Sequence, residues 1–170
     1  MAILNDIVAT YKGPARQIRK MLARGVREDR ALAYLMAGCL IVFVSQWPVL
    51  ARRAHLEGLE MGPLLGGSLL AWVFIMPLVL YMMAGLARLV ARLLGGKGDW
   101  YGARLALFWA LLATGPLMLL NGLVAGFIGP GPQLTLVGAV WFGAFLWFWL
   151  SGMRVAETAP QESKTTKVAS

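Results

Sequence analysis

Four long apolar segments constrain this chain more than any other feature of its sequence. They cover about residues 31–51, 64–87, 105–128 and 134–153, and none of them contains an acidic residue. Each is about 20 residues long or longer, the length that an α-helix needs to cross the roughly 30 Å hydrocarbon core of a bilayer. Inside that core a helix can satisfy all of its own backbone groups. We therefore predict an all-α membrane protein with four transmembrane helices.

The composition agrees with this prediction. Apolar residues make up 59% of the chain and charged residues 14%, whereas a soluble domain carries roughly 25% charged residues. At 170 residues the chain has room for the four spans, and we expect no additional soluble catalytic domain. The first segment begins far from the N-terminus and is followed at once by Arg52 and Arg53, so we expect it to remain in the mature protein. The single cysteine, Cys39, excludes an internal disulfide and a cysteine-built metal site.

The lysines and arginines predict the orientation of the spans. Fourteen of the sixteen basic residues lie before the first segment, between the second and third segments, or after the fourth; the other two are Arg52 and Arg53. Because short basic loops resist translocation, both termini are predicted to be cytoplasmic, in a multi-pass protein of the cytoplasmic (inner) membrane. The net charge of +8 is then a topology signal, and we expect no nucleic-acid partner.

Residues 1–30 are predicted to form an amphipathic, basic helical segment on the cytoplasmic side. Gly13 and Pro14 divide this segment into two short helices. The second helix has an apolar face opposite a basic face, a pattern typical of helices that lie among lipid headgroups and contact anionic lipid. Packing of the same face against the bundle or a partner is equally consistent with the periodicity. The apolar face comprises Ala15, Ile18, Met21 and Leu22, and the predicted headgroup contacts are Arg16, Arg19, Lys20 and Arg24.

A glycine-rich loop with a lysine follows the second segment, and it does not fit a phosphate-binding loop. That motif requires a glycine five positions before the second glycine and a serine or threonine after the lysine, whereas this chain has Ala91 and Gly98 there. Glycines after a helix end permit a left-handed turn, and Asp99 favours the start of another helix. Trp100 suits the headgroup layer. We predict a cytoplasmic turn between two spans.

Small residues predict close packing between the last two spans. Gly122 and Gly126 lie four apart in the third segment, and Ala139 and Gly143 lie four apart in the fourth. Such pairs let helix backbones approach closely in lipid. Because the connector between the two spans is short, the two pairs fall at similar depth, and we predict a tightly packed hairpin. Self-association through these residues is the alternative.

Polar residues and prolines inside the spans leave two functions open. Gln46 and Asn121 lie at comparable depth and are predicted to share an interhelical hydrogen bond. Pro48, Pro77 and Pro116 are predicted to kink their helices. Kinked helices line the sites of some transporters, so a small transporter or channel is an alternative function. The lack of ionisable residues deep in the spans argues against it.

No residue pattern predicts catalysis, and we expect no catalytic, cofactor-binding or metal-ligating residues and no cofactor. His55 with Glu57 and Glu60 would be a sparse metal site. They are the only basis for a membrane-bound enzyme as a third function. Trp141 and Phe145 in the fourth segment suit packing or lipid contact better than a quinone, a pigment or a partner helix. Residues 154–170 are predicted to form a disordered cytoplasmic tail.

Three stretches together resemble the bacterial branch of the YIP1 family. They are the basic segment with Pro14-Ala15-Arg16, the glycine-rich turn with Trp100-Tyr101, and the stretch from Arg104 to Pro116. The resemblance implies a non-enzymatic multi-span protein that acts through partners; eukaryotic members associate with Rab GTPases in early secretory membranes. We therefore predict a structural, membrane-organising or accessory interaction subunit. Its expected partners are the lipid bilayer with its anionic lipids, other membrane proteins, or a second copy of the chain.

Overall fold

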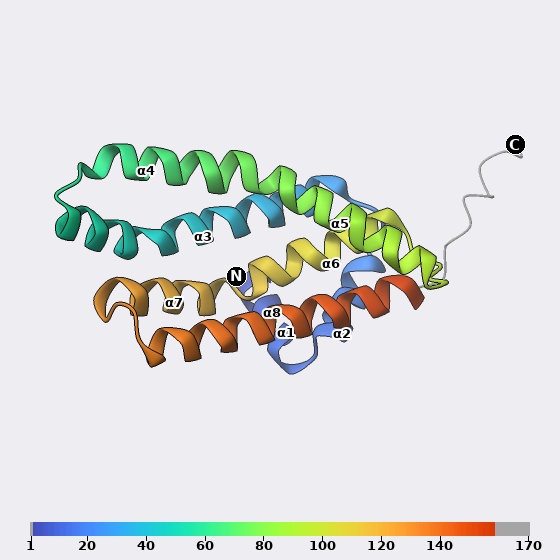
Figure 1. The fold of residues 1–170 in the computed structure, drawn as a ribbon. Helices are drawn as coiled ribbons and strands as arrows, with labels where there is room; N and C mark the ends of the chain where they lie inside the picture. The colour runs from blue at the N-terminus through green and yellow to red at the C-terminus, as the bar shows by residue number, and fades with distance from the viewer. Residues whose placement is uncertain (1, 159–170) are drawn as a thin grey trace, which may run out of the picture.

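The computed structural model describes residues 2–158, which form helices joined by short turns (Figure 1). The predicted all-α fold is confirmed. Three helical stretches are each long and apolar enough to cross a membrane, and a bent pair of helices forms a fourth candidate span, so the chain is a multi-pass membrane protein. The elements are α1 (Ala2–Lys12), α2 (Pro14–Leu22), α3 (Glu28–Glu57), α4 (Met61–Leu69), a π-helical segment η1 (Leu70–Ile75), α5 (Met76–Leu93), α6 (Trp100–Ala113), α7 (Gly115–Phe127) and α8 (Pro132–Thr158).

The helices are longer than the apolar segments that predict them. The first span, predicted at 31–51, extends over the whole of α3, and the second, predicted at 64–87, runs without interruption from α4 through α5. The fourth, predicted at 134–153, continues as α8 to Thr158, which corrects the start of the predicted tail from residue 154. The rest of that predicted tail lies outside the described residues. Charged residues continue each helix into the headgroup layer, where their side chains can reach water.

The three prolines have different effects on their helices. Pro116 lies in the first turn of α7, and the axes of α6 and α7 meet at 45° beside it, so the third span is two helices joined at the kink predicted there. Pro77 follows η1, whose wider π turn lets the helix continue past a residue that cannot donate a backbone hydrogen bond. Pro48 lies within α3, which is one helix from Glu28 to Glu57. Only at Pro116 does the proline interrupt its helix.

The turns contain the residues that the sequence singles out for them. Gly95 follows α5 with φ of +88°, a left-handed conformation that suits glycine. The Asp99 carboxylate accepts a 2.7 Å hydrogen bond from the backbone N–H of Trp100, at the first turn of α6. The predicted helix–turn–helix between the second and third spans is therefore confirmed.

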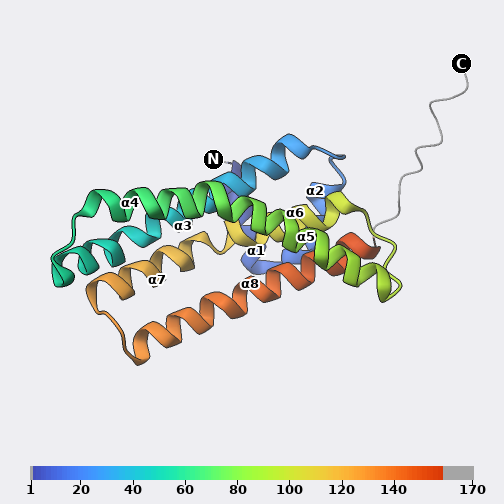
Figure 2. The ribbon, with the colours of Figure 1, turned by 45° about the horizontal axis from the view of Figure 1, so that its top comes forward.

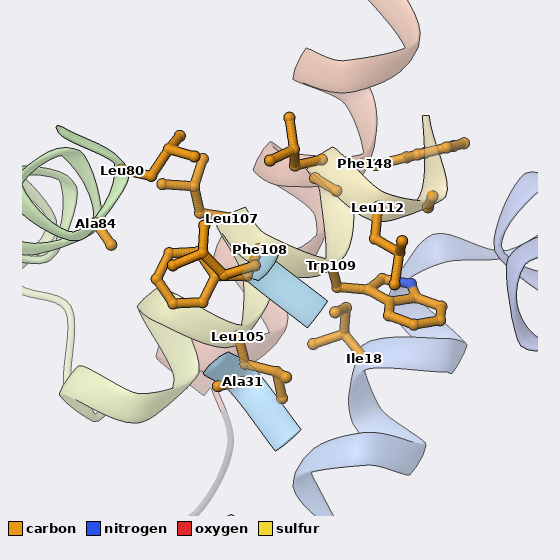
Figure 3. Close-up of a cluster of buried hydrophobic side chains, with 14 of the residues drawn as sticks. Ile18, Ala31, Leu80, Ala84, Leu105, Leu107, Phe108, Trp109, Leu112 and Phe148 are labelled. Carbon is orange, nitrogen blue, oxygen red and sulfur yellow. The ribbon is translucent and has the colours of Figure 1, made fainter. Parts of the chain in front are cut away.

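One half of the molecule is a bundle built around α6. This helix contacts α3, α5 and α8, and the two N-terminal helices, α1 and α2, also pack against it (Figures 1 and 2). Almost every residue of α6 is buried, which suits a helix that is apolar on all sides. Leu105, Phe108 and Trp109 of α6 belong to one cluster with side chains from the surrounding helices (Figure 3).

The other half is a single layer of helices in the order α4, α3, α7, α8 (Figures 1 and 2). Many large apolar side chains on this layer are exposed, Phe127 and Phe142 among them. In a bilayer such side chains face acyl chains, so their exposure carries no hydrophobic penalty. We call the end of the bundle with loops 23–27 and 94–99 the basic end, and the end with loops 58–60 and 128–131 the opposite end.

Candidate functional site at the basic end

The N-terminal hairpin, which consists of α1 and α2, packs against α6 and α8 of the bundle. Ile18 and Met21, from the predicted apolar face of α2, are buried against α6 and α8, and Ala15 and Leu22 are partly buried beside them. Figure 3 shows Ile18 in the same cluster as Trp109 of α6. The periodicity of this face is consistent with either lipid contact or packing against the bundle, and in the structure the face packs against the bundle.

The outer side of the N-terminal hairpin is both basic and apolar. Arg16, Arg19, Lys20 and Arg24, the predicted headgroup contacts, are all exposed. Lys20 lies 3.4 Å from the Asp6 carboxylate of α1, a contact that joins the two short helices. The outward side chains of α1 include Ile3, Leu4 and Val8, which are each more than half exposed. This surface offers cations to headgroups and aliphatic side chains to acyl chains.

Two polar side chains near the end of α1 bind the bundle. Trp109 Nε1 of α6 donates to Thr10 Oγ1 at 3.0 Å, and the Thr10 hydroxyl donates to the Asp6 carbonyl at 2.7 Å. The Tyr11 hydroxyl donates to the Ala113 carbonyl at 3.0 Å. Burial raises the pKa of the Tyr11 phenol, so it remains a protonated donor at neutral pH.

The Ala113 carbonyl needs an outside donor because it lies in the last turn of α6. The last four carbonyls of a helix have no partner within it. In the adjoining turn the Thr114 hydroxyl lies 2.8 Å from the Ala110 carbonyl and 3.2 Å from that of Leu111, and Thr114 is fully buried. Tyr11 of α1 and Thr114 thus supply side-chain donors to the carbonyls where α6 and α7 separate.

Arg88 lies in a second polar cluster at the basic end. Its guanidinium Nη1 is 3.2 Å from the Glu157 carboxylate, and its Nη2 donates to the Gly98 carbonyl. The backbone N–H of Gly98 donates to the same carboxylate at 2.8 Å. Arg88 is 7% exposed, so its guanidinium lies within this cluster and not among lipid headgroups. The cluster instead ties loop 94–99 to the C-terminal turn of α8.

Small residues bring α6 and α8 together beside this cluster. A Cβ atom added to Gly102 would lie 2.8 Å from the Cβ of Ala156, and one added to Gly152 would lie 2.9 Å from the Cβ of Ala106. Each helix therefore presents a small residue every fourth position to the other. The sequence shows the four-residue spacing in both helices, but it does not predict this crossing. The predicted contact between the third and fourth spans lies instead near the connector that joins them.

The predicted packing of Gly122 and Gly126 on the fourth span is wrong. These glycines face α3: a Cβ atom on Gly122 would overlap the Ser45 carbonyl oxygen, and one on Gly126 would overlap the Pro48 ring. On α8, Ala139 is exposed and Gly143 has nothing within 4 Å of the position of an added Cβ. The bend at Pro116 turns α7 towards α3, so the short connector does not fix its closest neighbour.

The predicted hydrogen bond between Gln46 and Asn121 is also absent from the described residues. Both amides are half-buried, and no hydrogen bond joins them. The Asn121 amide nitrogen instead lies 3.6 Å from the position of a Cβ on Gly138 of α8. Equal depth along two helices does not make two side chains point at each other.

Two arginines at the opposite end contact neighbouring groups of the protein. Arg52 Nη1 donates to the Gly126 carbonyl at 3.3 Å, in the last turn of α7. Arg53 pairs with Glu57 one turn away, with Nε 3.0 Å from the carboxylate. Within residues 2–158 no group of three His, Cys, Asp or Glu side chains is placed to hold a metal ion.

Aromatic side chains form a column along α8. The rings of Trp141 and Phe145 are stacked with centroids 5.9 Å apart, and Trp149 lies 5.9 Å from Phe145. Phe148 contacts Tyr11 of the N-terminal hairpin edge-on at 5.0 Å. The aromatic residues of the fourth span therefore contact one another and α1.

Comparison of the chain with models of known protein families, with curated proteins and with solved structures gives no match. The resemblance to the YIP1 family gains no support from these comparisons.

Proposed function

We propose that this chain is a non-enzymatic protein of the cytoplasmic membrane that organises the membrane or serves as an accessory interaction subunit, with both termini in the cytoplasm. The observation that carries the proposal is the N-terminal hairpin, which is docked on a transmembrane bundle while its outer side exposes cations and aliphatic side chains. Such a surface suits a bilayer leaflet that contains anionic lipid.

Three polar side chains buried in the bundle are held by structural hydrogen bonds, which supports a structural function over a chemical one. Arg88 binds Glu157 and Gly98, Thr10 binds Trp109, and the Ser45 hydroxyl donates to the Val42 carbonyl. A catalytic group needs hydrogen-bonding capacity left for a substrate. The YIP1-like stretches lead to the same proposal.

Retention of anionic lipid tests the proposal. The protein is purified in mild detergent from membranes that contain phosphatidylglycerol, and the lipid bound per protein is measured by mass spectrometry. We expect the pair Arg19→Gln and Arg24→Gln to lose half or more of the retained phosphatidylglycerol. The control pair, Arg92→Gln and Arg154→Gln, removes the same charge from exposed sites at the basic end and should keep most of it. Equal loss in both pairs would contradict a lipid contact located on the hairpin.

Purification in mild detergent also tests the interaction part of the proposal. A subunit of a larger assembly should elute with a second copy or with other membrane proteins. A monomer that binds no protein under these conditions would count against an accessory subunit and would leave membrane organisation through lipid alone.

A small transporter or channel is the second candidate, because the third span is broken at 45° and the second contains a π-helical segment. Interrupted helices line the binding sites of many transporters. Proton flux into liposomes, reported by a trapped pH dye, tests this candidate. Flux above that of empty liposomes that falls in Gln46→Leu or Asn121→Leu would favour transport over the structural function.

A further inference from the structure

The break between α6 and α7 leaves backbone carbonyls without helical partners inside a span. In hydrocarbon each unsatisfied backbone group is costly, so such breaks persist only where the surrounding protein supplies donors. The donor for the Ala113 carbonyl is the Tyr11 hydroxyl, which is more than 100 residues distant in sequence and belongs to a different helix. The N-terminal hairpin therefore stabilises the broken form of the third span directly.

The outer side of the same hairpin faces the surroundings of the protein. Ile3, Leu4 and Val8 project away from the bundle, whereas Ile7 and Thr10 project into it. The exposed cations of α2 complement the negative charge of anionic headgroups. Under the proposed function, lipid of the adjacent leaflet would contact α1 on the side facing away from the break.

Docking of the hairpin is incomplete in ways that favour release. Gln17 is 4% exposed, and its Nε2 has no hydrogen-bond partner among the described residues, a cost that water would remove. The hairpin joins α3 through the short loop 23–27, in which Gly25 has φ of +82°. The hairpin thus contains a buried unpaired amide and is joined to the first span by a short loop that contains glycine.

We propose that the N-terminal hairpin is a lipid-responsive clamp on the break between α6 and α7. With anionic lipid in the leaflet the hairpin stays docked, and Thr10 and Tyr11 satisfy Trp109 and the Ala113 carbonyl. Without it the hairpin leaves, and water reaches the break. The inference rests on the proposed contact between the hairpin and anionic lipid.

Accessibility of the break to a water-soluble thiol reagent tests the clamp. The full chain carries Cys39→Ala and Ala113→Cys, and the rate of modification by a membrane-impermeant methanethiosulfonate is measured in lipid nanodiscs. Ala113 is fully buried, so the introduced thiol should react slowly while the hairpin is docked. The rate is compared between nanodiscs with one-third phosphatidylglycerol and nanodiscs of phosphatidylcholine alone, so this arm needs no change in the hairpin.

The hairpin bonds are removed in a second arm by Thr10→Val with Tyr11→Phe. We expect the modification rate to rise about tenfold or more, as for the loss of the two hydrogen bonds between the hairpin and α6. The control, Thr135→Val with Thr158→Val, removes side-chain hydrogen bonds to backbone carbonyls away from the break and from the hairpin, and it should leave the rate within about twofold. Omission of phosphatidylglycerol should also raise the modification rate of the chain whose hairpin is unchanged.

Three results would overturn the clamp: a rate unchanged by the hairpin substitutions, a rate indifferent to phosphatidylglycerol, or a parallel rise in modification of native Cys39 in chains without Ala113→Cys. Cys39 is fully buried in α3, so its reaction reports general loosening of the bundle. Loss of retained lipid in Arg19→Gln with Arg24→Gln, without any lipid effect on the modification rate, would leave the proposed function standing and reject the clamp.

Discussion

Replacement of Gly122 by alanine should weaken the contact between α3 and α7. An added Cβ would overlap the Ser45 carbonyl oxygen and lie 2.7 Å from the carbonyl carbon, whereas ordinary contacts are 3.4–4 Å. The two backbones would have to separate by about 1 Å or more, because neither atom belongs to a side chain that can rotate away. The closely packed pair of helices would lose its interdigitation along the whole contact.

The size of the effect follows from two opposing terms. Overpacking of a well-filled interior typically costs about 1–3 kcal/mol. Replacing a helical glycine by alanine returns up to about 1 kcal/mol through helix propensity. For Gly122→Ala we expect a net loss of about 2 kcal/mol in the free energy of unfolding, since the clash is with backbone. For Gly143→Ala, where no atom lies within 4 Å, only the propensity term applies and stability should be unchanged or slightly higher.

Unfolding by sodium dodecyl sulfate in mixed micelles, followed by the loss of helical circular dichroism, measures this difference. The wild type and the two variants are titrated under the same conditions. The reasoning predicts the order Gly122→Ala, then wild type, then Gly143→Ala, from least to most stable. If Gly143→Ala is the more destabilised variant, the fourth span packs through Ala139 and Gly143 as the sequence suggests, and the assignment of Gly122 to α3 is wrong.

Two further predictions concern the charges. Arg88→Met should lower the free energy of unfolding by about 3 kcal/mol, because Glu157 then loses its buried partner, whereas Arg92→Met at an exposed site should have little effect. Thermal unfolding in detergent measures both variants, and equal effects would contradict the pairing of Arg88 with Glu157. Reporter fusions at the two termini should both be active on the cytoplasmic side, and reporters inserted in loops 58–60 and 128–131 should be active on the outer side. Termini on opposite faces of the membrane, or release of the chain by high salt alone, would refute the four-span topology.

The four spans and the turn at Gly95 could be predicted from the sequence because they depend on local properties. Bilayer thickness fixes the length of an apolar segment, and a helix end requires a residue that tolerates positive φ. The apolar face of α2, with Ile18 and Met21, was likewise visible from helical spacing. Each of these inferences concerns residues within one segment.

The partner of each face was decided only by the tertiary structure. Helical spacing marked Gly122 and Gly126 as packing residues, but the bend at Pro116 turns them towards α3. Arg88 gave no sign of its pairing with Glu157, which is 69 positions away, and Tyr11 gave none of its bond to the broken span. Periodicity identifies which side of a helix is buried, whereas the neighbour that covers it depends on how all the helices pack at once.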